Sequence, residues 1–101
     1  MQIIRMYSVF DMKVEAFRQP FFFRTKGEAL RAWSDLVNDS QSEINAHPED
    51  YVLYEFGTMD SSTGKMEVHD TPLVVGAARD FLHPDGNVVP EQRKTKVREV
   101  N

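Results

Sequence analysis

The stretch that decides the fold is residues 25–38, which read TKGEALRAWSDLVN. Thr25 followed three residues later by Glu28 is a capping-box pattern, in which both side chains satisfy free backbone amides at a helix start. The apolar residues beyond it recur at offsets that gather on one helical stripe: Ala29, Leu30, Trp33, Leu36 and Val37. The stretch therefore predicts one amphipathic helix over about residues 26–38.

Two strand-forming segments precede this helix. Residues 3–10 (IIRMYSVF) are rich in β-branched and aromatic side chains and contain neither glycine nor proline, which favours a strand. Residues 17–24 contain three consecutive phenylalanines directly after Pro20. Because proline cannot donate to a sheet ladder, this second strand should start near Pro20 or lie at a sheet edge. The three rings must point to both faces of the sheet.

A β-hairpin is expected after the helix. Residues 40–50 are polar and predict a loop, with one helical turn over residues 42–46 as an alternative. Residues 51–59 and 65–69 alternate as strands do, and the segment between them, Asp60 to Gly64, is typical of a hairpin loop. In the second strand Met66 and Val68 are expected to point inward, and Thr71-Pro72 is expected to end it.

The last part of the chain leaves two alternatives open. Residues 73–82 predict either a short helix or a final strand over residues 73–75, and we favour a helix from Ala77 onward. Residues 83–101 are polar and partly basic, so we expect a tail that is ordered only against a partner or a neighbouring subunit. The chain thus divides into a single domain over residues 1–82 and a C-terminal tail over residues 83–101.

These elements predict an α+β domain: about four strands in a mostly antiparallel sheet, with the one main helix packed on one face. A single helix covers only part of such a sheet. The remaining apolar positions are expected to form a partner surface, and pairing of identical subunits is the commonest outcome, so we predict a homodimer. The candidates for this surface include members of Phe21 to Phe23 and one or more of Tyr51, Leu53 or Tyr54.

Composition excludes several classes of protein. With no cysteine among 101 residues, a disulfide framework, a thiol nucleophile and thiolate-held metals are ruled out. No apolar run is long enough for a membrane span, and no glycine-rich loop is present to cradle phosphates. His47, His69 and His83 lack metal-ligand spacing, although His69 lies beside Asp70, the arrangement of an oriented general base. We expect no enzyme activity, metal or cofactor.

The net charge of −4 is the sum over three zones of the chain that differ in charge. Residues 1–31 carry six basic and three acidic groups, residues 32–82 carry two and ten, and residues 83–101 carry four and three. Aromatic rings flanked by cations are typical of single-strand nucleic-acid binding, and mobile basic arms neutralise phosphates. The candidate nucleic-acid-binding residues are therefore Arg18, Phe21, Phe22, Phe23, Arg24, Lys26 and Arg31, together with Arg93, Lys94, Lys96 and Arg98 of the tail.

Acidic residues give an alternative function, a protein-interaction module. The middle zone presents a negative face that could grip a viral or host replication factor. The residues of this acidic face are Asp35, Asp39, Glu43, Glu49 and Asp50.

Several fragments of the chain together resemble one known family. Residues 6–11 (MYSVFD), 19–22 (QPFF), 25–32 (TKGEALRA) and 47–57 (HPEDYVLYEFG) are similar to the small nonstructural protein of gokushovirus-type microviruses (Microviridae), phages with circular single-stranded DNA. The resemblance covers about residues 3–82. It implies a nonstructural accessory, often labelled DNA-binding, that acts in the host bacterial cytoplasm when replication turns to single-stranded genomes for packaging. It brings no catalytic residues.

Overall fold

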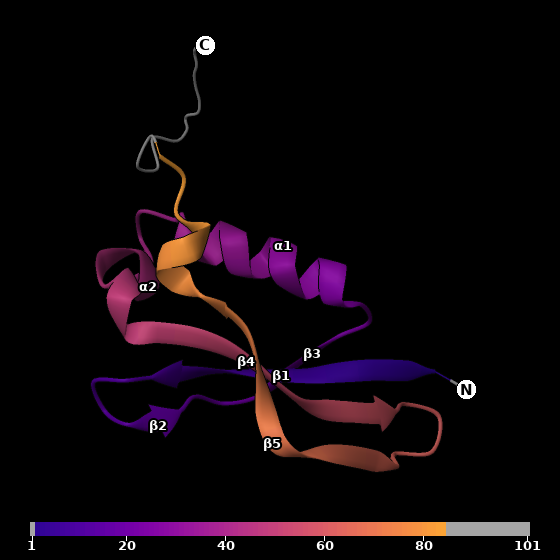
Figure 1. The fold of residues 1–101 in the computed structure, drawn as a ribbon. Coiled ribbons are helices and arrows are strands. Elements are labelled where there is room, and N and C mark those ends of the chain that lie inside the picture. The colour runs from indigo at the N-terminus through magenta and orange to yellow at the C-terminus, as the bar shows by residue number, and fades with distance from the viewer. Residues whose placement is uncertain (1, 85–101) are drawn as a thin grey trace, which may run out of the picture.

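The computed structural model describes residues 2–84, which fold into one antiparallel sheet with helices on one side (Figure 1). The helical elements are α1 (Lys26–Val37), α2 (Glu43–Ala46) and two 3-10 turns, η1 (Pro48–Asp50) and η2 (Ala78–Phe81). The strands are β1 (Ile3–Asp11), β2 (Ala16–Phe17), β3 (Phe21–Phe23), β4 (Tyr51–Asp60) and β5 (Met66–Ala77). Within the described residues, no helix is both long enough and apolar enough to cross a membrane.

Strand β1 is the centre of the sheet. Its one edge pairs with β4, which in turn pairs with β5, and its other edge pairs with both β2 and β3. The expected strand over residues 17–24 is therefore confirmed at an edge, but the segment around Pro20 divides it into two short strands. This division is why the sheet has five strands where about four were expected. The predicted α+β class is confirmed.

Helix α1 begins where the sequence predicts. The Thr25 side-chain oxygen accepts a hydrogen bond from the Glu28 amide at 3.1 Å. The other half of the expected capping box is replaced, because the Glu28 carboxylate contacts the Arg24 guanidinium at 3.4 Å. Part of the predicted stripe is buried against Tyr7, Val9 and Leu53 of the sheet, whereas Leu30 is half-buried and Leu36 is 41% exposed. The buried helix residues are Ala29, Trp33 and Val37.

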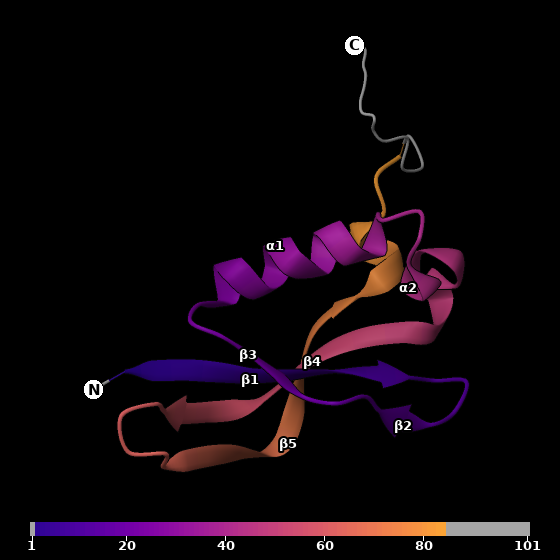
Figure 2. The ribbon, with the colours of Figure 1, turned by 180° about the vertical axis from the view of Figure 1, so that it is seen from behind.

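All the helical elements lie on the same side of the sheet (Figures 1 and 2). The expected helical turn after residue 42 is confirmed as α2, with the Ser42 hydroxyl accepting from the amides of Ile44 and Asn45. Asn38 ties this layer together, because its side-chain amide donates to the carbonyl of Phe81 at 2.9 Å. Residues 2–84 thus form two layers, and none of the helices in this range lies over the other face of the sheet.

Strand β5 corrects two expectations. Thr71-Pro72 does not end the strand: the ladder to β4 stops after Val68 and resumes at Leu73, so Pro72 lies in the interval without paired residues. An edge strand tolerates this, since only one of its sides needs donors. The two alternatives for residues 73–82 each hold in part, because the strand continues to Ala77 and the helix is a single 3-10 turn from Ala78.

A β-bulge in β4 sets which side chains share a face. The register shifts at Phe56 relative to both neighbouring strands. A Cβ atom on Gly57 would lie 2.1 Å from the backbone oxygen of Glu67, so only glycine lets β5 approach this closely. The bulge adds one residue, so beyond it the residues that face away from α1 change from even to odd numbers: Tyr54 and Phe56 before it, Met59 after it.

Candidate functional site

The face of the sheet opposite α1 is uncharged at every position in strand register. We call it the open face. Its members follow from the alternation of β1 and from the paired residues on the neighbouring strands. They are Ile4, Met6, Ser8, Phe10, Phe17, Val52, Tyr54, Phe56, Met59, Met66, Val68 and Val74. The expectation that Met66 and Val68 point inward is wrong, because both are exposed on this face.

Four aromatic rings gather on the open face around Phe17. The centroid of the Phe17 ring lies 4.9 Å from that of Phe10, 5.3 Å from that of Tyr54 and 4.9 Å from that of Phe56, each pair edge-to-face. Strands β1, β2 and β4 each contribute to this cluster. Edge-to-face pairs contribute about 0.5–1.5 kcal/mol beyond burial, so the cluster holds its shape although Phe17 stays 41% exposed.

The three phenylalanines of β3 point to both faces, as predicted. Phe21 and Phe23 face α1, where their rings lie 6.2 and 6.3 Å from the Tyr7 ring. Together with residues of α1 they line an apolar pocket of about 240 Å³. Phe22 pairs with Met6 and stands 38% exposed at the rim of the open face. Of the three rings, Phe22 is therefore the one accessible from outside.

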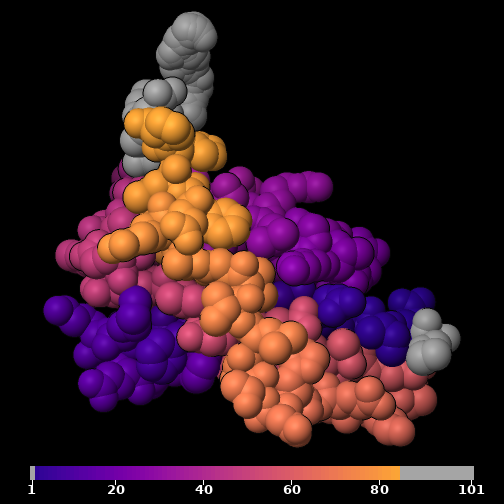
Figure 3. Space-filling view, viewed as in Figure 1, coloured from indigo at the N-terminus to yellow at the C-terminus, as the bar shows by residue number. Residues whose placement is uncertain are grey.

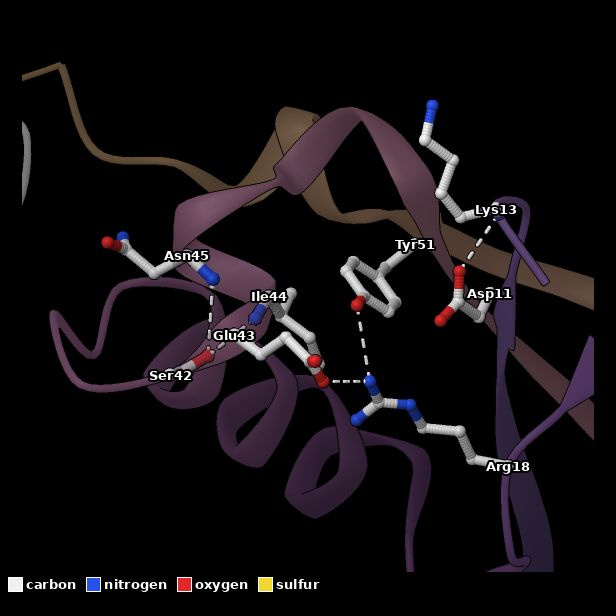
Figure 4. A network of polar contacts seen from close by, with 8 residues as sticks. All are labelled: Asp11, Lys13, Arg18, Ser42, Glu43, Ile44, Asn45 and Tyr51. Carbon is white, nitrogen blue, oxygen red and sulfur yellow. Dashed lines mark hydrogen bonds and ion pairs between the residues drawn. The ribbon is translucent and has the colours of Figure 1, made fainter.

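Arg18 is engaged within the protein (Figure 4). Its guanidinium donates to the Glu43 carboxylate and, at 3.2 Å, to the Tyr51 hydroxyl, and it lies 4.9 Å above the Tyr51 ring centroid. The hydrogen bond to Glu43 is the main reason that the pKa of Arg18 is raised above its ordinary value. We call this contact the Arg18 clamp, because it fastens the segment after β2 to α2.

The other candidate cations of the first zone are on the surface. Arg24, Lys26 and Arg31 are all exposed, and they come from the end of β3 and the first half of α1. With Phe22 they form what we call the β3–α1 rim. Four of the expected residues are thus exposed on β3, on α1 and between them, whereas Phe21 and Phe23 pack against the helical layer and Arg18 is ion-paired with Glu43. The candidates Arg93, Lys94, Lys96 and Arg98 lie outside the described residues.

A buried polar cluster was not expected from the sequence. Glu55, 7% exposed, accepts from Arg5 at 3.2 Å and contacts His69 Nε2 at 2.8 Å. His69 is therefore placed beside Glu55 of β4 in addition to its sequence neighbour Asp70. Burial, and then the nearby Glu55 carboxylate, raise the pKa of Tyr7, whose hydroxyl has no hydrogen-bond partner among the described residues. The sequence feature that could have predicted this cluster is Glu55, a charged residue at an inward position of the alternating residues 51–59.

The acidic face lies at the end of the molecule where α1, α2, η1 and η2 meet. Asp35, Asp39 and Glu49 are exposed, whereas Glu43 is held by the Arg18 clamp. Within the described part of the chain, one group has metal-ligand atoms within 4.8 Å of one another: His47, Glu49 and Asp50. These are surface groups, and we assign no ion to them.

Comparison with known proteins gives one match. A family model described as Phage ORF5 protein matches residues 4–81, which include every strand and helix of the domain. The chain therefore belongs to the Phage ORF5 protein family, and its resemblance to a phage protein is confirmed. Neither a curated protein nor a solved structure matches the chain.

Proposed function

We propose that this phage protein is a non-enzymatic accessory of single-stranded DNA genome replication or packaging in gokushovirus-type microviruses, acting in the cytoplasm of the host bacterium. In this proposal it contacts single-stranded DNA along the β3–α1 rim. The observation that carries the proposal is the exposed Phe22 ring on the edge strand β3, which is followed within nine residues of the chain by the exposed cations Arg24, Lys26 and Arg31.

The chemistry of the rim suits a single strand. A base that stacks on an aromatic ring gains about 1–3 kcal/mol whatever its identity, and nearby cations neutralise the phosphates that follow. Phe21 and Phe23 pack against α1, so Phe22 between them is held pointing away from the helix. The chain as a whole is acidic, with a net charge of −4, so binding should be local and sensitive to salt.

A fluorescence-anisotropy titration of the full chain with a labelled oligothymidine tests this function. We expect binding at tens of micromolar protein in low salt, weakening as salt rises because counterions are released on binding. Absence of binding under the low-salt condition would overturn the proposal.

Matched variants locate the contact. Phe22→Ala should weaken binding about tenfold, the loss of one base stack. Val14→Ala removes an equally apolar, exposed side chain from the turn between β1 and β2 and should leave binding unchanged. The pair Arg24→Gln and Lys26→Gln should weaken binding and flatten its salt dependence. The pair Lys65→Gln and Arg79→Gln removes the same charge elsewhere and serves as its control.

The acidic face supports a second candidate, a module that grips a viral or host replication protein. The observation that favours it is the meeting of α1, α2, η1 and η2 at one end, where the elements and the turn after α1 carry the exposed acids Asp35, Asp39 and Glu49. Co-purification from infected cells separates the two functions. An association through DNA should be lost on nuclease treatment, and a direct protein contact should survive it.

A further inference from the structure

We infer that the open face binds the open face of a second copy of this chain, forming a two-fold symmetric dimer. This inference does not depend on DNA binding, although Phe22 of the β3–α1 rim borders the open face beside Met6. It starts from the side chains that the fold leaves exposed. On the open face Val68 and Val74 are each 65% exposed, Met66 is 49% exposed and Phe17 is 41% exposed.

The exposed apolar area of the face is that of a functional patch. An aromatic side chain buries about 150–250 Å² and aliphatic side chains bury less, so the exposed fractions of Phe17, Met66, Val68 and Val74 leave on the order of a few hundred Å² of apolar surface. Apolar patches of this size on a single chain are often functional. A specific interface buries about 800 Å² per partner, and the polar edges of the strands supply the remainder.

Charge selects a second copy as the occupant. Phosphates need cations, and none of the open-face positions in strand register carries one, so the centre of this face does not suit a nucleic acid. Two copies of a chain with net charge −4 repel each other wherever acidic surfaces meet. An uncharged face is the surface on which a two-fold pairing avoids that repulsion, since each residue meets the same kind of surface.

The geometry also suits such a pairing. Two sheets pack face to face about 10 Å apart, a space that the aromatic cluster of each subunit would fill. Strand β5 lies uncovered along the near edge of the molecule, below α1 (Figure 3). All helical elements are on the other side of the sheet, so nothing described in the fold obstructs the approach (Figures 1 and 2).

Sedimentation equilibrium of the full chain tests the inference. We expect a mass of twice 11.7 kDa at high protein concentration. The substitutions Val68→Lys and Val74→Lys should shift the equilibrium to the single-chain mass. Leu36→Lys is the matched control, because Leu36 is 41% exposed on α1, away from the open face. A single-chain mass for the wild type up to hundreds of micromolar, or equal dissociation by the control, would overturn the inference.

Thiol accessibility gives a readout that does not depend on a disruptive charge. The chain has no cysteine, so Val74→Cys and Leu36→Cys each introduce one unique thiol. Maleimide should react several-fold more slowly with the first thiol in concentrated than in dilute protein, and at an unchanged rate with the second. Equal concentration dependence of the two would count against the dimer.

The two proposals fail separately. If Val74→Lys is monomeric and keeps wild-type oligonucleotide affinity, the open-face dimer is supported independently of DNA binding at the β3–α1 rim. If oligonucleotide binding is lost in Val74→Lys, Val68→Lys and a Phe17→Ala variant while the wild type sediments as a single chain, the open face binds DNA, and the dimer is overturned.

Discussion

The two faces of the sheet come from the same strands and differ in what their side chains do. On the α1 face, Tyr7, Val9 and Leu53 are buried under the helix. On the open face, Phe17 and Val74 remain exposed, and the buried side chains are those of Met6 and Ser8 on the central strand β1. The difference teaches that the stability of the domain resides on one face and that the other is left for association. Substitutions on the two faces should therefore have separable effects.

Replacing Trp33 by alanine should break the α1 face most severely. Trp33 is the largest helix residue in the core, and its removal should lower the free energy of unfolding by about 3–5 kcal/mol. Urea denaturation followed by circular dichroism measures this loss. Val74→Ala, on the open face, should change stability by only about 0.5 kcal/mol in dilute protein. Similar losses for the two variants would contradict the division between the faces.

Replacing Gly57 by alanine should disturb both faces at once. The added Cβ atom would meet the backbone oxygen of Glu67 at 2.1 Å, so β4 and β5 must separate, at a cost of about 2 kcal/mol or more. Thermal denaturation measures the effect. Gly27→Ala is the matched control, because its nearest neighbour is 3.9 Å away in the first helical turn, where alanine should be neutral or slightly stabilising.

Replacing Tyr7 by phenylalanine should show what a buried hydroxyl costs on the α1 face. Among the described residues the buried hydroxyl makes no hydrogen bond of normal geometry, although the Glu55 carboxylate lies near enough to raise its pKa, so its removal should raise stability at neutral pH by about 1 kcal/mol. Burial raises the pKa of Tyr7, which means that the folded state resists ionisation. The stability this gives is present below the ordinary tyrosine pKa of about 10 and is lost as pH rises beyond it.

Urea titrations of the two proteins at neutral and alkaline pH check this prediction. Tyr7→Phe should lose less stability in alkali than the wild type. A lower stability of the variant at neutral pH would mean that the hydroxyl makes a favourable hydrogen bond.

Replacing Arg18 by glutamine should give the smallest effect, a loss of less than about 1 kcal/mol, because the clamp is partly exposed and solvent screens it. This variant is to be compared with Arg24→Gln. The first variant should lower the melting temperature slightly and leave oligonucleotide affinity unchanged. Arg24→Gln should leave the melting temperature unchanged and weaken oligonucleotide binding, since Arg24 makes only a 3.4 Å contact with Glu28. Reduced affinity in Arg18→Gln would show that the clamp opens to bind DNA.

Local patterns predicted most of the fold. The Thr25 cap, the helical stripe and the alternation of residues 51–59 are each contained in a short segment, and the structure has all three. The errors arise where distant residues decide. Pro72 remains within a strand because β5 is an edge, a property that only the complete sheet defines. The bulge at Phe56 depends equally on β5, whose backbone fills the space beside Gly57.

The candidate site was predictable in its composition and less so in its geometry. The sequence indicated that Phe21, Phe22 and Phe23 must divide between two faces, but the choice of Phe22 depends on where α1 packs. Arg18 is not a free surface cation, because its guanidinium is paired with Glu43. Glu43 is 25 residues away, and no local pattern connects the two residues. The rings of the open face come from three strands, so their meeting required the sheet order.

The Arg18 clamp has a consequence for communication across the sheet. Phe17 and Arg18 are adjacent in the chain and serve opposite faces: the ring contacts three others on the open face, while the guanidinium contacts Glu43 and Tyr51 on the helical side. Strand β2, which carries Phe17, has only two residues, but hydrogen bonds also hold this segment to β1: the Arg18 amide donates to the Val9 carbonyl at 2.8 Å, and the Ser8 hydroxyl donates to the Arg18 carbonyl. This short, well-held segment therefore joins the aromatic cluster to the acidic end of the molecule, and a substitution within it should be felt on both surfaces.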